Sequence, residues 1–215
     1  MPMITLYGCY RSRASRNLWL LGELGRDVAH VPVVQRYRIS DDQAARMLHT
    51  AHPDYLAITA TGAIPALVDG DLVLTESLAI NLHLAEGSPL GPRDGAERAQ
   101  MIAAALYAAT ALEDHTLAIQ MAYGAGQGDG AAVTEAVDRL RRPLAVIEAQ
   151  LARHGHPVGG RFTVADINLA EVLRYAQPHA ALWADYPATR DWLAACQSRP
   201  AFRAMWAARE AELLA

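Results

Sequence analysis

The first third of the chain alternates between short apolar runs and longer periodic segments. Residues 3–7 and 28–34 are short, apolar and contain β-branched side chains, which predicts two strands. Between them, residues 12–25 repeat apolar side chains at spacings of three and four, which predicts a helix. The beginning of the chain is therefore expected to fold as strand, helix, strand.

The segment that follows is expected to contain a hairpin between helices. The runs IPALV and DLVL flank Asp69-Gly70, a dipeptide that favours a two-residue turn between strands. Residues 41–60 are predicted to be helical with interruptions, and residues 76–87 form a further helical pattern. The predicted order of the first domain is β-α-β-α-β-β-α.

A break rich in proline and glycine, residues 87–94, predicts a linker between two domains. Residues 1–86 are expected to form an α/β domain, and residues 95–215 an all-α domain. The capping box Thr163-Val-Ala-Asp166 marks one helix start. Helices are predicted over 95–124, 130–154, 163–176 and 187–213, the last split near Pro200.

The composition narrows the classes of function. The chain has 215 residues and a net charge of −4, and no basic stripe is visible, so nucleic acid is not an expected partner. Its two cysteines, Cys9 and Cys196, match no metal-binding spacing or disulfide framework, which favours a reducing, cytoplasmic location. No signal peptide is expected, because the N-terminus lacks a basic segment and a long apolar run. No membrane span is expected, because no run of 18 apolar residues occurs.

Three segments resemble the cytosolic glutathione transferases, namely 6–25 (LYGCYRSRASRNLWLLGELG), 61–86 (TGAIPALVDGDLVLTESLAINLHLAE) and 162–173 (FTVADINLAEVL). Their order and spacing extend the resemblance over essentially the whole chain, and they are most similar to the serine-type, bacterial-like members. The resemblance implies the glutathione transferase fold, a thioredoxin-like domain followed by an all-α domain.

The chemistry of such an enzyme requires a lowered thiol pKa. A thiol with a pKa of about 8.5 is only a few per cent thiolate near neutral pH, and the thiolate is the nucleophile. A hydroxyl donor at a helix N-terminus stabilises a negative sulfur. In serine-type members the catalytic serine lies five residues after the tyrosine that closes the first strand. Tyr7 occupies that strand position, so the resemblance implies Ser12 as the catalytic donor.

Four alternatives remain open around this serine. If the family resemblance is set aside, Ser12 is best explained as an ordinary helix N-cap. Tyr7 matches the catalytic tyrosine of tyrosine-type members, but it equally suits the core at a strand end. Cys9 forms a C-x-x-S pattern with Ser12, three residues before the place where cysteine-type members carry their nucleophile. Ser15 lies one turn into the helix, where a structural role is favoured.

The resemblance also implies residues that bind glutathione. Ile64-Pro65 is similar to the cis-proline turn of the family, where the backbone of Ile64 would pair with the cysteinyl part. Glu76 and Ser77 resemble the acidic-residue-plus-serine pair that binds the γ-glutamyl ammonium and carboxylate groups. The alternatives are an ordinary proline at the first residue of a strand and an ordinary helix start.

One position departs from the family pattern. Many members have Lys or Gln where this chain has Ala63, and that side chain contacts the glycyl end of glutathione. Glycyl recognition is therefore open. The basic candidates to replace it are Arg36, Arg38, His49 and His52.

The electrophile pocket is expected along the 8–14 loop and the first long helix of the second domain. At helical spacing the residues of that helix suit a core or a dimer interface equally well. The candidate lining residues are Tyr10, Arg13, Tyr107, Leu112 and His115.

The expected function is conjugation of glutathione, as co-substrate, to small hydrophobic electrophiles by a homodimer that needs no metal. A glutathione-transferase-like binding or scaffold module without turnover is one alternative, because fold does not fix function. Another is a different glutathione-dependent enzyme, an isomerase or a disulfide reductase.

Overall fold

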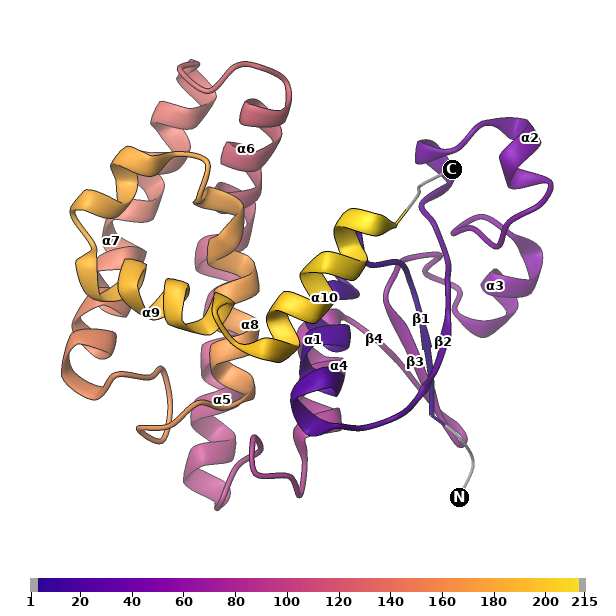
Figure 1. The fold of residues 1–215 in the computed structure, drawn as a ribbon, viewed down its shortest axis with the longest axis horizontal. Coiled ribbons are helices and arrows are strands. Elements are labelled where there is room, and N and C mark those ends of the chain that lie inside the picture. The colour runs from indigo at the N-terminus through magenta and orange to yellow at the C-terminus, as the bar shows by residue number, and fades with distance from the viewer. Residues whose placement is uncertain (1–3, 213–215) are drawn as a thin grey trace. The chain divides into compact units, whose positions relative to one another are not determined.

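The computed structural model describes residues 4–212, which form two compact units (Figure 1). The sheet unit contains residues 4–85 together with 200–212, and the helical unit contains residues 86–199. Within residues 4–212, no helix is both long enough and apolar enough to cross a membrane.

The sheet unit is built on four short strands in the order β2-β1-β3-β4. β1 pairs with β2 in parallel and with β3 antiparallel, and β4 completes the sheet as the antiparallel partner of β3. This is the predicted order of elements, and it confirms the thioredoxin-like fold. The strands are β1 (Thr5–Tyr7), β2 (Ala29–Val31), β3 (Ala66–Asp69) and β4 (Leu72–Thr75).

Helices lie on the sheet because alternate strand residues face opposite sides. Leu6 and Leu67 pair directly across β1 and β3 and are fully buried. Tyr7 and Ala66, the next pair, pack with Tyr55 of α3. Figure 1 shows α1 and α4 together beside the strands. The helices are α1 (Ser15–Leu24), α2 (Asp41–Ala44), α3 (Pro53–Ile58) and α4 (Ser77–Ala85), with a short 3₁₀ turn at Arg36–Arg38.

The last helix, α10 (Pro200–Ala211), also belongs to the sheet unit, where it packs along α1. The Trp19 and Phe202 rings meet edge to face with centroids 4.9 Å apart. A Cβ atom added to Gly22 would lie only 3.3 Å from the Cβ of Ala201, so the two helices approach closely there. The expectation that residues 95–215 form one all-α domain is therefore corrected at its C-terminal end.

The helical unit confirms the predicted helices, including the break before Pro200. A π-helical turn, Ala108–Leu112, joins the first two helices. Short 3₁₀ turns follow at Arg174–Ala176 and Ala180–Ala184. The α-helices are α5 (Gly95–Tyr107), α6 (Glu113–Gly124), α7 (Ala131–His154), α8 (Val164–Leu173) and α9 (Pro187–Gln197).

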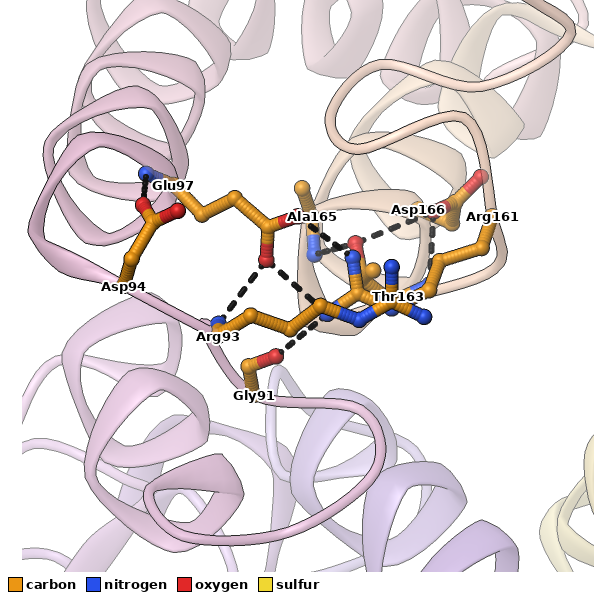
Figure 2. Close-up of polar contacts among 8 residues, drawn as sticks. All are labelled: Gly91, Arg93, Asp94, Glu97, Arg161, Thr163, Ala165 and Asp166. Atoms are coloured by element: carbon orange, nitrogen blue, oxygen red, sulfur yellow. Dashed lines mark hydrogen bonds and ion pairs between the residues drawn. The ribbon is translucent and has the colours of Figure 1, made fainter.

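Polar caps fix the starts of α5 and α8 (Figure 2). The predicted capping box is present, because the Thr163 N–H donates to the Asp166 carboxylate at 2.8 Å and the Ala165 N–H donates to Thr163 Oγ1 at 3.2 Å. Arg161, in the loop before α8, donates to both oxygens of Glu97 in the first turn of α5, at 2.9 and 3.0 Å. This ion pair connects two segments that lie 64 residues apart.

Two predicted boundaries differ from the structure. The hairpin loop is Gly70-Asp71 instead of Asp69-Gly70, because Asp69 still pairs with Leu72 and the positive φ of 61° falls on Gly70. The first helix begins at Ser15, three residues later than expected, because the residues from Ser12 onward first form a turn.

Candidate active site

The loop between β1 and α1 is fixed by a glycine that has no room for a side chain. Gly8 adopts φ 149°, and a Cβ atom there would lie 2.7 Å from the Cβ of Ala14. The Gly8 N–H donates to the Val31 carbonyl at 3.1 Å, and its carbonyl is 2.8 Å from Nε2 of His30. The start of the loop is therefore held against β2 and against the start of α1.

Ser12 lies in this loop, and it is buried with 9% of its surface exposed. Its hydroxyl donates to the Cys9 carbonyl at 2.7 Å and accepts from the Ala14 N–H at 3.0 Å. The second bond places the hydroxyl oxygen beside Ala14, the residue that precedes α1, and so close to the end of the helix where the dipole favours negative charge. A rotation about its side-chain bond would redirect the hydroxyl proton away from Cys9.

The rivals of Ser12 occupy different environments. Tyr7 packs against Tyr55, with ring centroids 6.0 Å apart. Cys9 is 1% exposed, and burial, more than the negative charge of Glu212, raises the pKa of its thiol. Ser15 is completely buried as the first residue of α1. Cys9 is consequently a poor thiolate near neutral pH.

The peptide bond between Ile64 and Pro65 is cis. The hydroxyl of Tyr55 donates to the Ala63 carbonyl at 2.6 Å and so holds the chain just before this bond. The Ile64 side chain packs against the buried cluster that contains Cys9. The turn is therefore next to the loop that carries Ser12, while Ala63 itself is exposed.

Glu76 and Ser77 stand at the start of α4 in an unusual backbone arrangement. Glu76 has φ 69°, a left-handed conformation that costs a non-glycine residue on the order of 1–2 kcal/mol. Ser77 follows as the first residue of the helix and is 3% exposed. Strain of this kind concentrates at ligand-binding positions.

Two polar residues that the sequence analysis missed connect this helix start to α1. Arg16 is 1% exposed, and its Nη1 donates to Ser77 Oγ at 3.0 Å. Asn17 is fully buried, and its Nδ2 donates to the Ser77 carbonyl at 2.9 Å and to Asn81 Oδ1 at 2.7 Å. The signal in the sequence is that Asn17 falls three residues after Ala14, on the apolar stripe of the helix, where a polar side chain needs a partner.

The basic candidates for the glycyl end already have local contacts. Arg36 forms an ion pair with the first residue of α2, and Arg38 Nη1 donates to the Arg11 carbonyl at 2.8 Å. Nδ1 of His49 and Nδ1 of His52 each accept a backbone N–H at 3.2 Å. Burial, followed by the neighbouring charge of His52, lowers the pKa of His49, which favours its neutral form.

The candidate electrophile-binding residues are divided between the two units. Tyr10 and Arg13 belong to the sheet unit, where the Tyr10 ring lies edge-on to His30 with centroids 5.4 Å apart. In the helical unit, the Tyr107 hydroxyl donates to the Pro143 carbonyl at 3.4 Å, and burial raises its pKa. Leu112 ends the π-helical turn and is fully buried, and His115, in the first turn of α6, is half-buried.

The mixed sheet in the order β2-β1-β3-β4, with the cis-proline turn before β3, defines a thioredoxin-like domain. Comparison with known proteins agrees with this class. Residues 2–86 match the model of the glutathione S-transferase N-terminal domain, and residues 130–195 match that of the C-terminal domain.

Individual relatives extend the similarity along nearly the whole chain. Glutathione S-transferase 3 of Zea mays is 35% identical over 94% of this chain and 93% of its own length. Glutathione transferase F7 from Populus trichocarpa has a TM-score of 0.77 at 25% identity, covering 96% of this chain and 99% of that one. Glutathione S-transferase I, solved with lactoylglutathione bound, has a TM-score of 0.76 at 27% identity, and the match covers 96% of this chain and 99% of that one. The chain belongs to the glutathione S-transferase family and is a glutathione S-transferase, with glutathione as its co-substrate.

Proposed function

We propose that Ser12 is the residue that stabilises the glutathione thiolate, and that the thiolate attacks small hydrophobic electrophiles. The observation that carries the proposal is the bond from the Ala14 N–H to Ser12 Oγ at 3.0 Å, which sets the hydroxyl at the N-terminal end of α1. The donor hydroxyl and the helix dipole then act on the same sulfur, and both favour its negative form. The buried, high-pKa thiol of Cys9 supports neither a nucleophilic cysteine nor disulfide reduction.

Recognition of glutathione is assigned to the same unit. The backbone of Ile64, before the cis peptide bond, pairs with the cysteinyl part as an added strand would. Ser77 and its N–H at the start of α4 receive the γ-glutamyl carboxylate, and Glu76 receives its ammonium group. The buried guanidinium of Arg16, on Ser77 Oγ, adds positive charge where a carboxylate would arrive.

Electrophile-binding residues are assigned in each unit by itself: Tyr10 and Arg13 in the loop of the sheet unit, and Tyr107, Leu112 and His115 in the helical unit. This set is mainly aromatic and apolar, which suits a small hydrophobic molecule, since ligand pockets combine apolar walls with few polar groups. Proximity of the two bound reactants then supplies much of the rate enhancement.

We also propose that the enzyme is a cytoplasmic homodimer. The edge strand β4 exposes Leu72 and Val73, at 41% and 44%, and α5 exposes Ile102 and Leu106, at 44% and 60%. Large apolar side chains on an unpaired sheet edge and on a helix face are typical of protein interfaces.

The test compares the wild-type chain with Ser12→Ala, and uses Ser15→Ala as the matched control. Glutathione binding is measured by calorimetry, and conjugation is measured with an aromatic chloride. We expect the Kd of Ser12→Ala for glutathione to lie within a few-fold of the wild-type value, while kcat falls by about 10²–10³. A fall of this size is typical when one hydrogen-bond donor to a negatively charged reacting atom is removed. Ser15→Ala should keep the wild-type rate. Wild-type conjugation by Ser12→Ala would remove Ser12 from the mechanism, and a wild-type chain that binds no glutathione would favour a scaffold module.

A further inference from the structure

The last turn of α10 and the residue that follows it hold the loop that carries Ser12. Both carboxylate oxygens of Glu212, the residue after α10, accept hydrogen bonds from consecutive backbone N–H groups, those of Tyr10 at 2.8 Å and Arg11 at 2.7 Å. A bidentate bond to an ionised acceptor is roughly twice as strong as a neutral one and fixes the direction of both donors.

Side chains also bind the carbonyl groups of the same two residues. The guanidinium of Arg209, on the last turn of α10, donates to the Tyr10 carbonyl, and Arg38 donates to the Arg11 carbonyl at 2.8 Å. In return, Nε of Arg11 donates to the Arg209 carbonyl at 3.2 Å. Every backbone polar group of Tyr10 and Arg11 is thus held by a side chain, and Glu212 and Arg209 supply three of these four contacts.

The helix that presents Glu212 and Arg209 is itself fixed within the sheet unit. Phe202 packs edge to face on Trp19 of α1, and Trp206 stacks on Phe202 with centroids 5.7 Å apart. The Arg209 guanidinium lies 5.3 Å from the centre of the Trp206 ring. A rigid element thereby supports the loop, which is the arrangement that keeps a functional group in position.

We propose that Glu212 is a positioning residue for catalysis, and that it sets the orientation of Ser12 through the Tyr10-Arg11 backbone. This inference rests on the role proposed for Ser12. The Ser12 hydroxyl bonds to Cys9 on the far side of these two residues, so the path of Tyr10 and Arg11 determines where that hydroxyl points. Glu212 touches neither reactant in this role and acts only through the loop.

The charge of Glu212 works in the opposite direction to its hydrogen bonds. A carboxylate beside the loop disfavours a nearby thiolate, and it contributes to the raised pKa of the Cys9 thiol. The guanidinium groups of Arg11, Arg38 and Arg209 bond to backbone carbonyl groups of the loop and of the end of α10, and they carry the opposite charge. If Glu212 acts by positioning the loop, removing its carboxylate should slow the reaction. If its charge dominates, removing the carboxylate should speed the reaction, so an experiment can separate the two effects.

Two variants make this separation in the full-length protein. Glu212→Gln removes the charge and turns two donor hydrogens toward one of the N–H groups. Glu212→Asp keeps the charge, but its side chain is one methylene too short to hold both N–H groups from the same backbone position. Glu210→Gln is the matched control, because Glu210 undergoes the same change two residues away, where its carboxylate accepts only the Trp206 indole N–H at 3.0 Å among the bonds described.

The measurements are kcat at saturating glutathione, the pH profile of kcat/KM, and hydrogen exchange of the Tyr10 and Arg11 amides. We expect both Glu212 variants to lose about 10-fold in kcat, to shift the acidic limb of the profile to higher pH and to lose amide protection, because small misplacements of a catalytic group are costly. Glu210→Gln should match wild type. Unchanged kcat and profile in Glu212→Asp, or a faster Glu212→Gln with its limb at lower pH, overturn the proposal. Failure of the role of Ser12 is recognised separately, because Ser12→Ala would then keep the wild-type rate whatever the Glu212 variants do.

Discussion

Replacing Gly8 by alanine tests whether the geometry of the β1–α1 loop controls the activity. The new Cβ atom would lie 2.7 Å from the Cβ of Ala14, whereas two carbon atoms in contact are about 3.5–4.0 Å apart. The Ala14 Cβ is bound directly to the backbone and cannot rotate away. The start of α1 must therefore move by about 1 Å relative to β1 to relieve the clash.

The cost of this substitution has two parts. Overpacking of this kind destabilises proteins by about 1–3 kcal/mol, and the positive φ of 149° adds about 1–2 kcal/mol for a residue with a side chain. Gly25→Ala is the control, because Gly25 also has a positive φ, 56°, but nothing lies within 4 Å of its added Cβ. We expect a loss of about 1 kcal/mol for Gly25→Ala and about 3 kcal/mol for Gly8→Ala in urea unfolding.

The two variants should differ more strongly in catalysis. A displacement of about 1 Å at a catalytic group reduces rates by up to about 10²-fold, so Gly8→Ala should lose most of its kcat while Gly25→Ala keeps it. The assay is conjugation of glutathione to an aromatic chloride at a temperature where both variants are folded by circular dichroism. Equal stabilities and equal rates for the two variants would refute the argument that the contact between Gly8 and Ala14 places Ser12.

Two further predictions concern buried charge and pH. Arg16→Met should raise the KM for glutathione about 10-fold, because it removes a charge-assisted bond to Ser77, whereas Arg16→Lys should retain part of the affinity. Steady-state kinetics with varied glutathione measures both variants. An unchanged KM in Arg16→Met would contradict the role of Ser77. The hydrogen bond from Arg161, more than that from the Arg93 N–H, lowers the pKa of Glu97, so this carboxylate stabilises the fold above its unfolded pKa of about 4.3 and loses that contribution as the pH falls through its folded value. The melting temperature of Glu97→Gln should therefore be lower than that of wild type at pH 7, and the difference should close below about pH 4. Glu86→Gln breaks a more exposed pair with Arg98, so it should change the melting temperature little at pH 7. A difference between Glu97→Gln and wild type that stays constant with pH would contradict this prediction.

The sequence was most informative where short-range patterns decide the structure. The strands, the helix order, the capping box at Thr163 and the cis bond at Pro65 follow from residue type and from the family resemblance, and the structure confirms them. The start of α1 was wrong by three residues because Ser12 bonds within a turn that no periodicity reveals.

Contacts between distant segments could not be predicted in the same way. Arg16 is a polar residue in an amphipathic helix until α4 is packed beside it, and only then does its bond to Ser77 exist. The last helix has the same apolar periodicity whether it covers the helical unit or α1, so its place in the sheet unit was missed. Glu212 carried no sequence signal, because a single acidic residue after a helix is ordinary.

The membership of α10 in the sheet unit has a consequence for synthesis on the ribosome. The helical unit is continuous in sequence, so it can fold as soon as residues 86–199 have emerged, whereas the sheet unit needs residues that lie before and after them in the sequence. Until α10 has emerged, the side of the Trp19 ring that meets Phe202 in the finished fold is not covered by it. The sheet unit is thus begun before the helical unit but completed after it. A nascent chain that stops before Pro200 lacks the helix that completes the sheet unit, which contains Ser12.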